Sequence, residues 1–171
     1  MDPLIAHLET AERLSEVTQR VGFTLWQLQE LEGVAATYFV LLVQATPRMG
    51  TEAGEILVAR ARGKTFGATI RELKTAGLLT SELEQRLHKL LRERNWLVHS
   101  SRADSRAAVY SDSELGALLF RLDRVAAEAL ALLKEIDTLT EKHVMARGVS
   151  KRDIDVAAAS LLTKWHKADA I

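Results

Sequence analysis

Apolar residues recur at intervals of three and four along two long stretches of this chain, and that spacing constrains the fold more than any other feature. An α-helix makes one turn every 3.6 residues, so side chains at this spacing share one face. In the first stretch, about residues 10–44, they are Leu14, Val17, Val21, Leu28, Leu31, Ala35, Tyr38 and Leu42. In the second they are Leu115, Leu119, Leu122, Ala126, Ala129, Leu133 and Ile136. The pattern predicts two long helices that pack against each other.

Residues that interrupt helices are scarce. The 171 residues include two prolines and nine glycines, and aromatic residues make up 5%. Shorter helices are predicted near residues 51–58, 66–76, 81–99 and 150–170. We therefore expect an all-α fold, a single-domain helical bundle over residues 1–171 with two long antiparallel helices plus shorter ones. Its core should span about residues 10–145, followed by a C-terminal helix at about 150–170.

Capping boxes mark where three of these helices begin. In such a box a serine or threonine accepts a hydrogen bond from the backbone three residues later, and an acidic side chain at that position reaches back. The pairs are Ser81 with Glu84, Ser111 with Glu114, and Ser150 with Asp153. The serine-rich residues 100–105 are predicted to form a loop.

The chain offers no feature of a secreted, membrane or metal-binding protein. It contains no cysteine, which excludes disulfides and thiolate sites. The N-terminus lacks the basic and then apolar run of a signal peptide, and the longest apolar run, residues 38–43, is far shorter than the roughly 20 residues that span a membrane. The histidines have no metal-ligand spacing. We expect a cytoplasmic protein with no membrane partner, metal or cofactor.

Arg94 lies on the leucine stripe of the helix predicted at 81–99. Leu87 and Leu90 precede it by seven and four residues, and Leu97 follows it by three. A guanidinium keeps its charge in proteins, so burial without a partner is costly. A structural interpretation is that the arginine reaches a surface carboxylate. A functional interpretation is that it lines a site.

Asn95 and His99 follow Arg94 and share one helix face. An unbroken helix would separate Arg94 from His99 by about 140°, but if the helix ends here the two side chains can converge on one pocket. The guanidinium suits phosphate, and a neutral imidazole can take and return a proton near pH 7. An asparagine amide can orient either group. Together they suit phosphodiester cleavage in RNA without a metal. Alternatively, His99 is a histidine favoured by the helix dipole.

Basic residues surround this trio although the net charge of the chain is zero. Between Arg60 and Arg106 there are eleven basic residues and five acidic ones. The four nearest the trio are Lys89, Arg92, Arg102 and Arg106. We expect these four to follow an RNA backbone, and the alternative is a set of solvated charges.

The end of the predicted helix resembles the signature of the HEPN superfamily (higher eukaryotes and prokaryotes nucleotide-binding domains). That signature is an arginine, often followed by a polar residue, with four to six residues between the arginine and a histidine. The matching residues are Arg94, Asn95, Trp96, Leu97, Val98 and His99. The order of helices over about residues 10–145 is similar too, as are the segments Lys64-Thr65-Phe66-Gly67 and Ile70-Arg71-Glu72-Leu73.

The resemblance implies an endoribonuclease of a toxin–antitoxin or phage-defence system that works without metal as a homodimer. Arg94 and His99 would be its catalytic pair, with Asn95 in support, and the motifs of two subunits would meet at a composite site. It also implies RNA as the substrate and an antitoxin or regulator as a partner. One HEPN subfamily carries a tyrosine two residues after the histidine, where it is modified; here that residue is Ser101.

Other interpretations stay open. A catalytically inactive HEPN-like dimer could bind nucleotide, RNA or a partner protein, and a plain helical scaffold would need no site. Trp26 and Trp96 are expected to be core anchors rather than platforms for base stacking.

Overall fold

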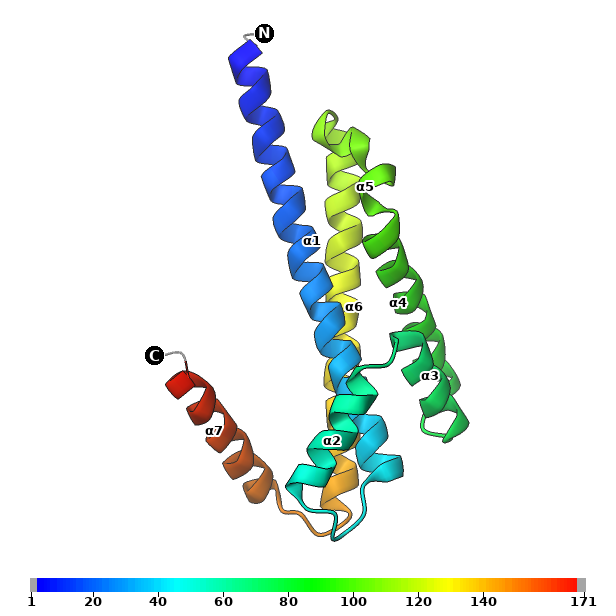
Figure 1. Ribbon diagram of the computed structural model, residues 1–171. Coiled ribbons are helices and arrows are strands. Elements are labelled where there is room, and N and C mark those ends of the chain that lie inside the picture. The colour runs from blue at the N-terminus through cyan, green and yellow to red at the C-terminus, as the bar shows by residue number, and fades with distance from the viewer. Residues whose placement is uncertain (1–2, 169–171) are drawn as a thin grey trace. The chain divides into compact units, whose positions relative to one another are not determined.

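The computed structural model describes residues 3–168, with side chains over residues 4–163, and every regular element in this part of the chain is helical (Figure 1). The elements are α1 (Pro3–Phe39), η1 (Val40–Gln44), α2 (Thr51–Arg62), α3 (Phe66–Thr75), α4 (Ser81–His99), α5 (Ser101–Asp104), η2 (Arg106–Val109), α6 (Asp112–Met145) and α7 (Lys151–Ala168). The all-α prediction is confirmed. The chain divides into two compact units, Met1–Ile136 and Asp137–Ile171. The expectation of one domain stays a prediction.

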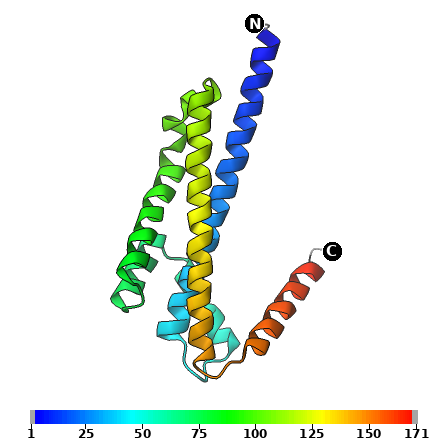
Figure 2. The same ribbon diagram turned by 180° about the vertical axis from the view of Figure 1, so that it is seen from behind.

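The long helices α1 and α6 run side by side in the same direction (Figures 1 and 2). Arg13 pairs with Asp112 at 2.6 Å, and further along both helices Arg20 pairs with Asp123 at 2.7 Å. The prediction of two antiparallel helices is therefore wrong. The reason is α4, a third long helix that brings the chain back to the end at which α1 begins, so that α6 starts there.

Buried leucines form the contacts among these three helices. The fully or nearly fully buried side chains include Leu28, Leu31 and Ala35 of α1, Leu83, Leu87 and Leu90 of α4, and Leu122, Ala129 and Leu132 of α6. Each buried leucine stabilises the fold by about 1.5–3 kcal/mol relative to an exposed one. Of the fifteen residues on the two predicted stripes, eight are buried, and they are Leu28, Leu31, Ala35, Tyr38, Leu122, Ala126, Ala129 and Ile136.

Two residues expected inside lie outside. Trp26 is 67% exposed and Leu14 is 55% exposed. Trp26 follows the buried Thr24 and precedes the buried Leu28 by two residues each, and two residues correspond to about 200° around a helix. The expectation that Trp26 anchors the core is therefore wrong.

The ends of the helices follow capping chemistry, with two changes from the predictions. The N-cap of α4 is Thr80, whose hydroxyl accepts a hydrogen bond from the backbone N–H of Leu83 at 3.2 Å, so Ser81 is the first helical residue. Ser111 accepts from the N–H of Glu114 as predicted. Residues 100–105 are not an open loop, because α5 and the turn of η2 continue almost directly from α4.

The second unit contains the end of α6 and the helix α7. Lys151 pairs with Glu141 at 2.7 Å, and the turn between them includes Gly148 in the left-handed region with φ of 92°. The backbone N–H of Ser150 donates to the Asp153 carboxylate, and the N–H of Asp153 donates to the Ser150 hydroxyl, each at 3.2 Å. This reciprocal pair confirms the capping box predicted for α7. Among the described helices, none combines the length and apolar character needed to cross a membrane.

Candidate functional site

Arg94 is held by a carboxylate that reaches it from α1. Its Nε donates a hydrogen bond to Oε1 of Glu32 at 3.1 Å, and the side chains are 33% and 23% exposed. The ion pair accounts for a guanidinium on an apolar stripe, as the structural interpretation required. Its terminal nitrogens, Nη1 and Nη2, have no hydrogen-bond partner among the described residues.

His99 and Asn95 lie on the exposed side of α4, away from Arg94. The helix continues unbroken to His99, so the separation of about 140° between Arg94 and His99 applies. The expectation that a helix end would let the two converge within one chain is wrong. Asn95 and His99, one turn apart, do share a face. Neither side chain forms a hydrogen bond or ion pair with another described residue.

The four basic residues predicted to contact RNA are exposed. Within the described part of the chain, Lys89, Arg92, Arg102 and Arg106 form no ion pair. Other cations of the same segment are engaged: Lys64 with Glu72, Lys74 with Glu84, and Arg86 with Glu128 and Glu135. The hydrogen bond to Glu128 is also the main reason why the pKa of Arg86 is raised. The structure therefore separates structural cations from available ones, and the four predicted residues are all available.

Trp96 is covered by an arginine rather than buried in the core. The guanidinium carbon of Arg121 lies 3.4 Å from the centre of the Trp96 ring, and the same arginine pairs with Glu93 at 2.8 Å. The indole N–H donates to Asp104 at 3.0 Å. Trp96 thus joins α4, α5 and α6 at the surface, and the stacked guanidinium takes one face of its ring.

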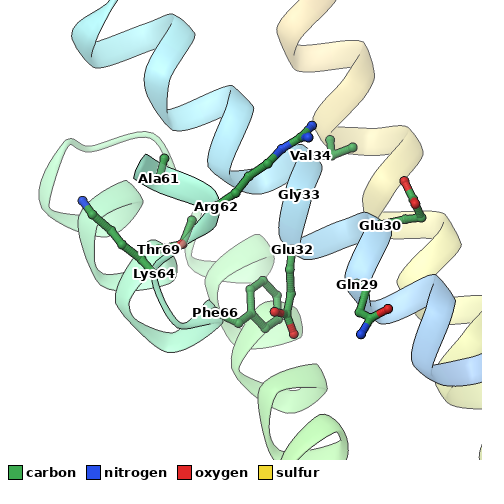
Figure 3. Close-up of a pocket in the computed structure, with 10 residues that line it drawn as sticks. All are labelled: Gln29, Glu30, Glu32, Gly33, Val34, Ala61, Arg62, Lys64, Phe66 and Thr69. Carbon is green, nitrogen blue, oxygen red and sulfur yellow. The ribbon is translucent and has the colours of Figure 1, made fainter. Parts of the chain in front are cut away.

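Glu32 also lines a cavity of about 310 Å³ between α1, α2 and α3 (Figure 3). Two cations lie on the walls of this cavity. Figure 3 shows the ammonium group of Lys64 pointing away from Glu32, and Lys64 pairs with Glu72 instead. The Arg62 side chain extends beside Gly33, and a Cβ atom added to Gly33 would lie 3.7 Å from Nε of Arg62. Glu32 therefore has Arg94 as its ion-pair partner, although Arg62 of α2 and Lys64 of the loop that leads to α3 line the same cavity.

A groove of about 690 Å³ runs between α4 and α6 on the side of Trp96. Its lining carries the paired Arg86 and Arg121 and two cations without an ion pair in the described residues, Lys89 and Arg124. Arg124 lies over the exposed ring of Phe120 at 5.8 Å. Glu93 and Glu128 also line the groove, but they pair with Arg121 and Arg86, so the charge of the lining that has no ion pair comes from Lys89 and Arg124 and is positive.

No group of three or more His, Asp or Glu side chains in the described residues is placed to hold a metal ion. Compared with protein-family models, with curated proteins and with solved structures, the chain matches none. The assignment of a function therefore depends on the geometry of Arg94, Asn95 and His99 and on the sequence motif that they form.

Glu32 is the residue that the sequence did not reveal. It lies 62 residues before Arg94 in the chain, and only the packing of α1 against α4 brings the two together. Its position directly after Leu31, at the edge of the buried stripe of α1, is the one signal that could have pointed to it.

Proposed function

We propose that this protein is a metal-independent endoribonuclease whose site is completed by two copies of the chain. The observation that carries the proposal is the division of the motif between two sides of α4. Arg94 is anchored through Nε to Glu32 with its terminal nitrogens available, whereas the exposed Asn95 and His99 lie about 100° and 140° away from it around the helix. A symmetric dimer packed along this end of α4 would set Arg94 of one subunit beside His99 of the other.

The chemistry follows from these two groups. The neutral His99 imidazole accepts the proton of a ribose 2′-hydroxyl, whose oxygen attacks the adjacent phosphorus. The bond from phosphorus to the 5′-oxygen breaks, and an imidazolium returns a proton to that oxygen. The products are a 2′,3′-cyclic phosphate and a 5′-hydroxyl. The terminal nitrogens of Arg94 stabilise the charge that builds on the phosphate oxygens, and Asn95 orients the substrate or the imidazole.

The available cations supply the affinity for RNA in this proposal. Lys89, Arg92, Arg102 and Arg106 are exposed and have no described ion pair, so each can neutralise a phosphate. Four such contacts to a single strand predict that log K falls with log salt at a slope of roughly −3.

An RNA cleavage assay in the presence of a chelator tests the proposal. Wild type should cut RNA and leave 2′,3′-cyclic phosphate ends, whereas His99→Ala and Arg94→Ala should lose at least a hundredfold in rate. His88→Ala is the matched control, because His88 lies on the same helix, pairs with Glu84 and should cut normally. Absence of cleavage, a 3′-hydroxyl end or full activity of the His99 variant would contradict the proposal.

A catalytically inactive dimer that binds RNA, nucleotide or a protein is the second candidate. The Arg94–Glu32 ion pair favours it, because a paired guanidinium offers less charge to a phosphate. Binding of RNA without cleavage by the wild type would select this candidate. For an active enzyme, the motif is typical of toxin–antitoxin and phage-defence effectors, and an antitoxin or regulator would then be the protein partner.

A further inference from the structure

A second groove begins directly after His99 and has a different character from the first. Its volume is about 530 Å³, and α1, α5, η2 and α6 contribute to it. The apolar side chains that line it are Leu14, Val17, Val21, Val109 and Leu118. Leu14 lies on the apolar stripe of α1 but is 55% exposed, because it lines this open groove. This volume falls within the range of small-ligand sites, about 300–1,000 Å³.

The charged residues that line this groove are all basic. Arg102 and Arg106 line it, one helical turn apart along the chain, and no acidic residue lines it. Neither arginine has an ion pair in the described residues. Two available guanidinium groups beside an apolar floor favour a ligand that carries an anion next to an apolar, planar body.

Tyr110 supplies an aromatic face at the same place. It lines the groove and is 76% exposed, so its ring is open to a ligand. Trp96, by contrast, is stacked on Arg121. Aromatic rings on which bases stack, next to arginines that bind phosphate, are the parts from which single-stranded nucleic acid sites are built.

We propose that this groove binds one nucleotide of single-stranded RNA, with its phosphate at Arg102 and Arg106 and its base against Tyr110. The inference rests on the proposed function and deepens it by naming the substrate class. Ser101 lines the groove two residues after His99, so the bound nucleotide is a near neighbour of the one that is cut. A base paired within a duplex cannot leave its stack to enter the groove without losing pairing energy. Single strands are therefore the preferred ligand.

Binding of a labelled RNA that cannot be cut tests the proposal. The probe is a 12-nucleotide single strand with 2′-O-methyl riboses and a 5′ fluorescein, and anisotropy at about 100 mM salt gives the affinity. Arg102→Gln with Arg106→Gln should weaken binding at least tenfold and reduce the salt slope by about 1.4. Tyr110→Leu should weaken it about tenfold, whereas Tyr110→Phe, which keeps the ring, should bind as wild type does.

Controls separate this groove from general attraction to positive charge. The pair Arg48→Gln and Arg60→Gln removes two exposed arginines that line no part of the groove, and should change affinity less than threefold. An abasic strand of equal length, which keeps the phosphates, and a duplex of the same sequence should both bind the wild type more weakly. Neither should respond to Tyr110→Leu. Equal loss in both arginine pairs, or a Tyr110→Leu variant that binds the single strand normally, would overturn the proposal.

The cleavage assay distinguishes failure of this inference from failure of the proposed function. If the wild type cuts no RNA but the probe still depends on Arg102, Arg106 and Tyr110, the nucleotide site stands and the ribonuclease proposal is wrong. If RNA is cut through His99 while the groove variants bind and cut normally, the ribonuclease proposal stands and the nucleotide site is wrong. The nucleotide site would also be wrong if the wild type did not bind the single strand and instead bound an acidic helical peptide tightly.

Discussion

A guanidinium on an apolar helix face needs a carboxylate within reach, and in this chain Glu32 supplies it. Both side chains keep contact with solvent, so the pair contributes at most about 1 kcal/mol to stability. Its larger effect is on orientation, because the hydrogen bond that Nε donates to Glu32 fixes the plane of the guanidinium and leaves both terminal nitrogens for a ligand.

Glu32→Gln should therefore affect catalysis more than folding. We expect cleavage to fall between about tenfold and a hundredfold, mainly in kcat, because the arginine loses its fixed orientation. The midpoint of urea unfolding should hardly move. The matched control is Glu30→Gln, since Glu30 lines the same cavity without pairing with Arg94. Unchanged kcat in the Glu32 variant, or an equal fall in the Glu30 variant, would show that Glu32 does not position Arg94.

The sequence predicted residues of this site only where the signal was local. Asn95 and His99 are four residues apart, and the period of the helix alone places them on one face. Glu32 could not be found in that way, because the contact joins residues 62 positions apart and depends on how α1 packs against α4. The end of α4 at residue 99 agrees with the prediction, and the expected convergence of Arg94 and His99 failed because it needed a break in the helix before the histidine.

At the scale of single elements, the period of apolar residues predicted where the helices lie, and capping chemistry decided their ends. The start of α4 was missed by one residue because Thr80 and Ser81 are both suitable N-caps and the motif with Glu84 favoured the serine. The serines of residues 100–105 suggested a loop, yet Ser101 donates to the carbonyl of Leu97 at 2.6 Å and continues the helical path.

Substitution at the two candidate caps of α4 distinguishes them. Thr80→Ala should lower the free energy of unfolding by about 1 kcal/mol, because the N–H of Leu83 loses its acceptor. Ser81→Ala should stay within about 0.5 kcal/mol of wild type, since its hydroxyl caps nothing. Urea unfolding followed by circular dichroism measures both. The reverse order of effects would place the cap at Ser81.

The first turn of α7 should respond to pH. Hydrogen bonds from the Ser150 hydroxyl and then from the Ser150 backbone hold the pKa of Asp153 below its usual value. A carboxylate with a lowered pKa stabilises the folded turn above the pKa of the unfolded state, and that contribution is lost as the pH falls through the folded pKa. We therefore expect the turn to fray below about pH 4.

Amide hydrogen exchange at Ser150 and Asp153 between pH 2 and pH 6 follows this transition, after correction for intrinsic exchange. Asp153→Asn should exchange at a rate that no longer depends on this titration, and Ser150→Ala should raise the pH at which the turn frays. Protection that persists unchanged to pH 2 in the wild type would rule out the mechanism.

At the scale of the whole molecule, the apolar stripes alone left the direction of the helices open. Apolar stripes say which faces meet, but a stripe is compatible with either relative direction of two helices. Direction depends on how many long helices separate α1 from α6, and the length of α4 makes it a full member of the bundle. The resulting parallel pair is held by Arg13–Asp112 and Arg20–Asp123, contacts about a hundred residues apart in the chain.

A site shared between two subunits predicts complementation between inactive variants. Arg94→Ala and His99→Ala should each be inactive alone, but mixing, partial unfolding and refolding them together should restore about a quarter of wild-type cleavage. Half of the random dimers would be mixed, and each mixed dimer would hold one complete site of two. Light scattering should give twice the chain mass. A monomer, or a mixture as inactive as its components, would contradict a composite site.

The short segment that joins α4 to α6 has a consequence for how such a protein can diversify. Between residues 100 and 111 only Ala108 is buried, so this segment makes almost no demand on the helical core. It nevertheless carries both arginines and the tyrosine of the proposed nucleotide groove, immediately after the histidine of the motif. Ligand preference can thus evolve within a dozen residues, by substitution or insertion, while the three-helix framework that holds Arg94 is inherited unchanged.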